Sequence, residues 1–146
     1  MDYIINSVKM GGLIKSVDDN RVKIHLYGRL GVIHVSKSII HTYEELEAGQ
    51  CVEFYFSYME AIEKPFDYDA TDIRASNKIA PSLLGGKIIE INDTAVVVDI
   101  MDEIGTINVP RRWVITPIEL KKGLDIEFYF SGMRVIGKKD LPIESI

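Results

Sequence analysis

The sequence predicts an all-β protein in which a duplicated unit forms two small five-stranded barrels that pack together. The first observation is that the pentapeptide Glu-Phe-Tyr-Phe-Ser occurs twice, at residues 53–57 and 127–131. The second is that residues 11–59 align with 85–133 without a gap, with 18 of 49 positions identical. The third is that each copy consists of short alternating segments separated by Gly, Asp and Asn, which is typical of strands joined by turns.

Each copy has the same order of elements. In copy one we expect strands at 11–19, 22–27 and 32–35, a short helix or 3₁₀ turn within 36–49, and strands at 52–57 and 59–64. The corresponding elements of copy two lie 74 positions later. Five strands and one short helix in about 55 residues are typical of an OB-like barrel, and an SH3-like barrel is the alternative.

The repeated pentapeptide predicts the centre of each core. Side chains alternate between the two faces of a strand, so Phe54 and Phe56 point one way and Glu53, Tyr55 and Ser57 point the other way. Burial of one phenylalanine stabilises a fold by about 1.5–3 kcal/mol. We therefore expect both phenylalanines of each copy in the core, which leaves the glutamate and the tyrosine for the outer surface.

The boundaries follow from the repeat. We expect a first barrel at 1–64, a linker at 65–82 and a second barrel at 83–146. The linker is polar and lies between two prolines, and Thr71 is placed to cap a short helix that reaches Ile79. The run Asp67–Asp72 has a faint resemblance to a calcium loop but lacks its Gly and its distal Glu, so we interpret it as a solvated linker.

Composition limits the class of protein. The chain has 146 residues, 47% of them hydrophobic, and a formal net charge of −5. These values are typical of a globular protein, and the acidic balance argues against a wide surface for polyanions. We find no apolar run of membrane-spanning length and no signal-peptide pattern, and the one cysteine, Cys51, suits a reducing compartment. We therefore expect a cytoplasmic protein.

Two runs in copy one resemble a known family. The segments Gly-Val-Ile-His-Val-Ser at 31–36 and Gly-Gln-Cys-Val at 49–52 resemble the RNA-binding OB repeat of the largest bacterial small-subunit ribosomal protein. That resemblance implies an OB barrel, with His34 on the third strand in the position of that family's histidine. The family has aromatic residues between strands one and two, where this chain has Asp18, Asp19 and Asn20. The resemblance therefore supports the fold more than RNA binding.

Two sets of residues are candidates for binding. A nucleic-acid surface needs cations beside aromatic rings, and the candidates are Lys23, Tyr27, Arg29, His34, Lys37, Arg111 and Arg112. The alternative interpretation of His34 is a plain solvent-facing strand residue, and Trp113, which aligns with Ile39, is expected in the core. A protein interface needs outward apolar or repeated side chains, and the candidates are Glu53, Tyr55, Val97, Met101, Glu127 and Tyr129.

No catalytic or metal centre is apparent in the sequence. The three histidines have no cysteine or carboxylate at ligand spacing, and no base pairs with Cys51 as a nucleophile. We therefore expect no cofactor, no metal and no enzyme activity. The leading hypothesis is a non-catalytic interaction module that binds a protein partner or itself. The alternative is an RNA or single-stranded nucleic-acid binder; an enzyme or a small-ligand sensor, with its site between the barrels, is a weaker alternative.

Overall fold

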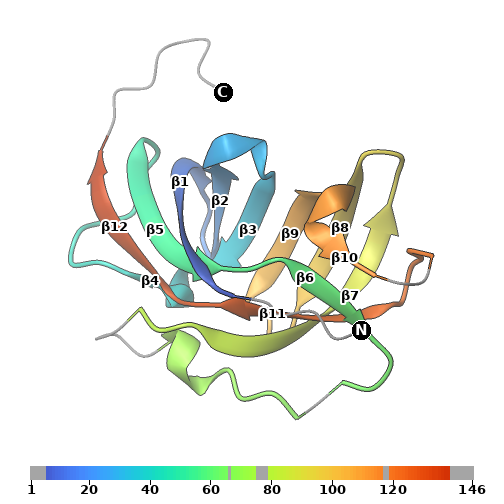
Figure 1. The fold of residues 1–146 in the computed structure, drawn as a ribbon. Helices are drawn as coiled ribbons and strands as arrows, with labels where there is room; N and C mark the ends of the chain where they lie inside the picture. The colour runs from blue at the N-terminus through green and yellow to red at the C-terminus, as the bar shows by residue number, and fades with distance from the viewer. Residues whose placement is uncertain (1–5, 66, 75–78, 117–118, 139–146) are drawn as a thin grey trace.

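A computed structural model of the chain describes residues 6–65, 67–74, 79–116 and 119–138 (Figure 1). The strands of the first repeat are β1 (Val8–Val17), β2 (Arg21–Leu26), β3 (Val32–Ser36), β4 (Ile40–His41), β5 (Gln50–Phe56) and β6 (Met59–Ile62). Those of the second are β7 (Ser82–Ile91), β8 (Ala95–Ile100), β9 (Gly105–Pro110), β10 (Val114–Ile115), β11 (Asp125–Phe130) and β12 (Met133–Lys138). Short 3₁₀ helices are η1 (Tyr27–Arg29), η2 (Lys37–Ile39), η3 (Thr71–Arg74) and η4 (Arg111–Trp113).

The strands form a ring. Antiparallel pairing runs in the order β5, β1, β2, β3, β9, β8, β7 and β11, and the ring closes where Phe130 of β11 pairs with Phe56 of β5. The prediction of an all-β, barrel-like duplicated fold is therefore confirmed. One feature differs from the expectation that each copy closes a barrel of its own, because all twelve strands of the described residues belong to a single sheet.

The last strand of each repeat is exchanged with the other repeat. β12 pairs antiparallel with β5 and parallel with β4, and β6 pairs antiparallel with β11 and parallel with β10. Figure 1 shows β12 running beside β5 and β6 beside β11. Each repeat therefore supplies a strand that completes the other. The alignment of the two repeats could not predict this exchange, because it identifies which segments are equivalent and not which strands pair.

The two Glu-Phe-Tyr-Phe-Ser segments cross at the point where the ring closes. Tyr55 N–H donates to Ser131 Oγ at 2.7 Å, and Tyr129 N–H donates to Ser57 Oγ at 2.8 Å. Ser57 and Ser131 are 1% and 0% exposed, so each hydroxyl bonds an amide of the other repeat away from water. This reciprocity places an internal two-fold axis at the crossing. It also explains why serine is part of the repeated pentapeptide.

The two repeats meet a second time on the opposite side of the ring, where β3 pairs with β9. Ile33 is opposite Ile107, and the same axis passes through this pair. The backbones approach so closely that a Cβ on Gly31 would lie 1.8 Å from the Asn108 carbonyl oxygen, and one on Gly105 would lie 2.0 Å from that of His34. The glycine that is repeated before this strand is therefore a requirement of the junction between repeats.

One hydrophobic core fills the ring. Phe54, Phe56, Phe128 and Phe130 are all 0% exposed, as predicted, but they belong to one cluster rather than two. Rings from different repeats are in contact: the Phe54 and Phe130 centroids are 5.5 Å apart, and those of Phe56 and Phe128 are 5.9 Å apart. A barrel of about 60 residues is only marginally stable alone, and a shared core buries more surface for each repeat.

The linker covers one end of the barrel. Asp69 accepts a bond from the Thr71 amide at 2.9 Å, so Asp69 caps η3 and Thr71 lies inside it, in contrast to the predicted cap. The helix ends at Arg74, and the part of its predicted extension at 75–78 lies outside the described residues. Arg74 donates to Ser38 Oγ of repeat one at 2.9 Å and to the Asp102 carbonyl of repeat two at 2.8 Å. None of the described helices has the length and apolarity of a membrane span.

Replacing Gly31 by Ala is expected to destabilise the protein by at least about 2 kcal/mol, because a Cβ would overlap the Asn108 carbonyl and because φ at Gly31 is +112°. The measurement is the free energy of unfolding in urea. Gly137→Ala is the matched control, since nothing lies within 4 Å of its added Cβ. Equal stability of the two variants would contradict the close approach of β3 to β9.

Candidate binding surface

A basic face lies on the β2–β3 hairpin of repeat one. Lys23 and His34 are directly opposite each other in the register of the two strands, and Arg21 precedes them on the same face. Partial burial lowers the pKa of His34, and the positive charges of Lys23 and Arg21 lower it further. The two cations therefore act on His34 in the same direction as its burial, and the carboxylate of Asp18 acts against them.

The equivalent face of repeat two is not basic. Val97, Asp99 and Asn108 occupy the positions of Lys23, His25 and His34. In the first repeat, residues 20–43 contain four Lys or Arg, all three histidines and no Asp or Glu. The equivalent residues 94–117 contain three acids and two arginines. The two halves of the outer surface therefore differ in charge even though their backbones are related by symmetry.

Tyr27 lies where β2 ends. Its ring packs over Gly11, and its hydroxyl donates to Cys51 Sγ at 3.3 Å. Burial first and this hydrogen bond second raise the pKa of Tyr27 to about 12. The contact with Gly11 and the bond to Cys51 fix the orientation of the ring. The residue is still 39% exposed, so part of the ring faces solvent.

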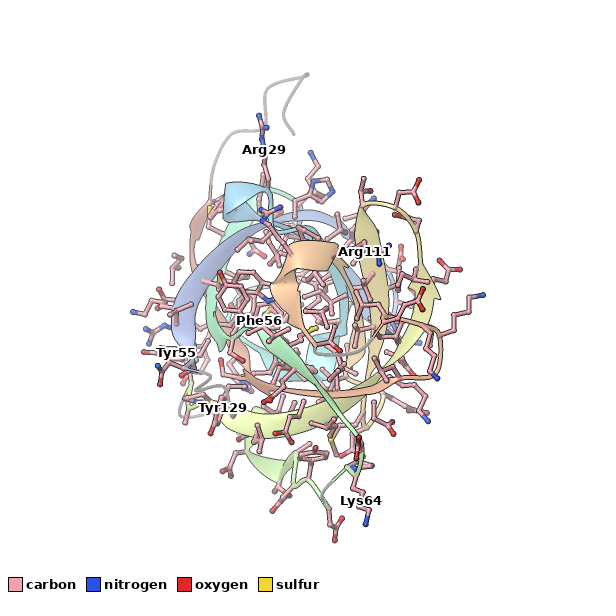
Figure 2. All side chains as sticks on the ribbon, turned by 45° about the vertical axis from the view of Figure 1, so that its right-hand side comes forward. Arg29, Tyr55, Phe56, Lys64, Arg111 and Tyr129 are labelled. Atoms are coloured by element: carbon pink, nitrogen blue, oxygen red, sulfur yellow. The ribbon has the colours of Figure 1, made fainter. Side chains whose placement is uncertain are left out.

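The turn after Tyr27 brings Arg29 toward η4. Val32 is opposite Asn108 in the antiparallel β3–β9 register. Arg29 precedes β3 and Arg111 follows β9, so both residues lie beyond the same end of this strand pair. Figure 2 shows Arg29 and Arg111 on the same side of the barrel. We call Arg29, Tyr58, Arg111, Arg112 and Trp113 the arginine end. Arg111 is tethered there by a bond from its Nη1 to the Asn92 carbonyl at 3.1 Å.

The opposite end of the barrel has a different charge. The two-fold axis relates Arg29 to Glu103 and Arg111 to Lys37, and a surface hollow there is lined by Glu103 and Lys37 together. At the positions of Arg29, Arg111 and Arg112 the opposite end has Glu103, Lys37 and Ser38, and there Arg74 of the linker donates to Ser38. Lys37 of the predicted set lies at this opposite end, whereas Lys23 and His34 lie between the two ends.

Trp113 is 7% exposed, in agreement with its predicted place in the core. Its Nε1–H donates to the Ser57 carbonyl at 2.9 Å, and its ring stacks on Phe56 with centroids 5.7 Å apart. Tyr58 stacks on the outer side of Trp113 with centroids 4.1 Å apart and is 47% exposed. Tyr58 is not among the residues predicted from the sequence. A signal was present, because Tyr58 aligns with Gly132 and is an aromatic residue gained by one copy only.

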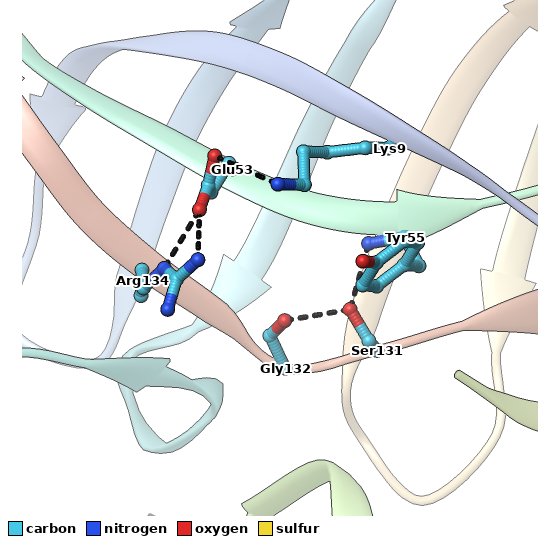
Figure 3. A network of polar contacts seen from close by, with 6 residues as sticks. All are labelled: Lys9, Glu53, Tyr55, Ser131, Gly132 and Arg134. Carbon is cyan, nitrogen blue, oxygen red and sulfur yellow. Dashed lines mark hydrogen bonds and ion pairs between the residues drawn. The ribbon is translucent and has the colours of Figure 1, made fainter. Parts of the chain in front are cut away.

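Most of the predicted interface residues contact other parts of the same chain. Glu53 accepts a bond from Arg134 Nε at 2.7 Å and lies 3.8 Å from Lys9 Nζ (Figure 3). The Tyr55 amide takes part in the crossing of the repeats, shown in the same figure. The cations around Glu53 line a hollow of about 80 Å³, where their charge is partly neutralised by the carboxylate.

The linker covers another part of the predicted interface. Tyr68 donates to Glu127 at 2.7 Å, and its ring lies against Gly85. Met101 Sδ accepts a bond from the Gly85 amide at 3.4 Å, so Met101 lies in the same area. Val97 and Tyr129 are half-buried. Of the predicted interface residues of copy two, Glu127 is therefore bonded to Tyr68 of the linker, and Met101 lies in the same area.

Among the described residues, no three His, Cys, Asp or Glu side chains gather in a way that could hold a metal ion. No protein-family model matches the sequence, and no curated protein matches it. The arrangement therefore has to be interpreted from its own chemistry, which is that of exposed cations beside oriented aromatic rings.

Lys23→Val, which introduces the residue of the equivalent position 97, is expected to raise the pKa of His34 because one neighbouring positive charge is removed. The measurement is a titration of the His34 imidazole by NMR, with the signal assigned from a His34→Asn spectrum. A folded pKa below the unfolded value means that this group favours folding above the unfolded pKa, and that this contribution is lost as the pH falls through the folded pKa.

The matched control for this titration is Lys122→Val, an exposed lysine of the loop before β11 that is not among the causes of the His34 shift. An unchanged His34 midpoint in the Lys23 variant, or a wild-type midpoint at or above about 6.5, would contradict the concentration of charge on this hairpin.

Proposed function

We propose that this chain is a non-catalytic binding module whose ligand is a single-stranded nucleic acid, with RNA as the first ligand to test. The observation that carries the proposal is the β2–β3 hairpin, residues 21–36, which contains Arg21, Lys23 and Arg29 and no Asp or Glu and leads to the arginine end. Cations in a row neutralise phosphates, and aromatic rings beside them stack bases. Both parts are needed for a strand whose bases are unpaired.

The geometry of the hairpin suits an extended ligand. Outward side chains recur about every 6.6 Å along a strand, because the rise is about 3.3 Å per residue and alternate residues share a face. Arg21 and Lys23 follow this spacing along β2. His34 lies beside them on β3, and Arg29 follows at the turn. A strand laid along the hairpin between Arg21 and Arg29 would therefore meet a row of positive charges, which ends where Asp19 and Glu103 line a hollow with Arg21.

The net charge of −5 does not oppose this placement. Acidic residues gather in the linker, in the β4–β5 loop at Glu44, Glu45 and Glu47, and in the β1–β2 turn at Asp18 and Asp19, which lines one hollow with Glu44 and Glu45. Exposed charges separated by more than about 8–10 Å are largely screened at physiological salt. A local basic face can therefore bind phosphate on an acidic protein.

Two further features support the proposal. The sequence at 31–36 that resembles the ribosomal OB repeat forms β3, and its histidine lies on the basic face. Cys51 is a free, buried thiol. A free thiol is typical of a reducing compartment such as the cytoplasm, where RNA is present.

Arg29→Glu, which introduces the residue of the equivalent position 103, is expected to weaken binding of a mixed-sequence 12-nucleotide RNA about tenfold or more at low salt. Each lost phosphate contact also reduces the slope of log K against log salt by about 0.7 for a single strand. Fluorescence anisotropy across a salt series measures both quantities.

Lys122→Glu makes the same change in net charge away from this surface and serves as the control. No anisotropy change with the wild-type protein at low salt would reject the proposal. Equal losses in the two variants would reject the assigned surface.

Self-association, or binding of a protein partner, is the second candidate. Tyr43 is fully exposed and Ile136 is 55% exposed. The parallel register of β4 and β12 continues toward both residues, which brings two apolar side chains to one edge of the sheet. Light scattering at increasing protein concentration is expected to show a dimer that Tyr43→Ser disrupts, and a monomer at every concentration would exclude self-association.

A further inference from the structure

Tyr58 presents an aromatic ring whose orientation is set by the residues beneath it. One face of the ring is covered by Trp113 at a centroid distance of 4.1 Å and an interplanar angle of 27°. Trp113 is in turn held by its bond to the Ser57 carbonyl and by its stacking on Phe56 of the core. Since Tyr58 remains 47% exposed, its exposed area lies on the other face and the edge of the ring.

The pseudo-equivalent position is closed. Gly132 takes the place of Tyr58 at the other end of the barrel, where a Cβ would lie 2.6 Å from the Ile73 carbonyl of the linker and 2.7 Å from His41 Nε2. The linker helix packs against this end, and Ile73 is completely buried. An exposed ring is therefore present at one of two symmetry-related ends, and it is the end where the arginines gather.

The charge around Tyr58 favours an anionic ligand with a flat group. Arg111 and Arg112 directly precede Trp113 in η4, so their side chains start within two residues of the stacked pair. Arg112 is exposed, and Arg111 is held over the turn by Asn92. A nucleotide provides both a planar base for the ring and a phosphate for the guanidinium groups.

We propose that the exposed face of Tyr58 stacks one unpaired base of the bound strand, with Arg111 and Arg112 contacting the phosphates beside it. This inference rests on the proposed function and adds to it a defined position for a base. Tyr58 then forms the outer layer of a stack that continues through Trp113 and Phe56 into the core, so a base would meet a surface that loses little conformational freedom on binding.

The experiment compares two probes that have the same phosphates. One is a 12-residue oligothymidine, and the other is a strand of the same length built from base-free tetrahydrofuran residues. Wild-type protein is expected to bind the thymidine strand about 5- to 160-fold more tightly, which is the range for stacking of a base on an aromatic side chain. In Tyr58→Leu the preference is expected to fall toward one, whereas Tyr58→Phe retains it.

Leucine is chosen because its apolar side chain can still cover Trp113, so the variant is expected to fold. The emission of Trp113, the only tryptophan, reports directly beneath the site and is expected to change with the thymidine strand in the wild type and in Tyr58→Phe. The preference between strands is a ratio within one variant, so a uniform loss of affinity through misfolding leaves it unchanged.

The outcomes separate the two proposals. If neither of these strands nor the mixed-sequence RNA binds the wild type at low salt, the proposed function fails. If both bind equally, or if Tyr58→Leu keeps the preference, the module still binds nucleic acid and only the stacking role is wrong. If a polyglutamate peptide of matched charge competes as well as the thymidine strand, the arginine end recognises negative charge without a base, and the stacking role is again overturned.

Discussion

The fold depends on the crossing of two identical pentapeptides at an internal two-fold axis. Where β5 passes β11, Ser57 and Ser131 each accept a hydrogen bond from a backbone amide of the other repeat. The ring closes there because Phe56 of β5 pairs with Phe130 of β11. After the crossing each repeat continues as a strand that pairs with the other repeat: β6 pairs with β11, and β12 pairs with β5. A buried amide that loses its acceptor costs about 1–3 kcal/mol, so the serines are constrained as strictly as the phenylalanines beside them.

This topology makes the two repeats inseparable. Neither repeat has a complete set of strands, because each takes its final strand from the other, and the phenylalanines of both repeats contact one another around the axis. Gly31 and Gly105 at the second junction are also required by contact between the repeats, since the backbones of β3 and β9 approach too closely there for a Cβ. Eight of the 18 identical positions, namely 31, 33, 35 and 53–57, lie at these two junctions.

The sequence predicted what depends on period and repetition, namely the strands, their order and the four core phenylalanines. It did not predict the exchange of β6 and β12, because alternation tells which face a side chain takes and not which strand lies beside it. The candidate basic residues came partly together: Lys23 and His34 are neighbours and Arg29 leads to Arg111, but Lys37 lies at the opposite end. Tyr58 was missed because it follows the repeated pentapeptide and aligns with a glycine.

Function in a duplicated barrel resides in the differences between copies. A perfectly symmetric chain would present the same surface twice, at two ends facing different directions. Here the linker helix closes one end over Gly132, and the other end retains the Tyr58–Trp113 stack with its arginines. The basic hairpin belongs to repeat one and η4 to repeat two, yet the β3–β9 junction places them side by side. A ligand that follows this charge must touch both repeats, so the β3–β9 junction that joins the repeats also builds a surface that neither copy has alone.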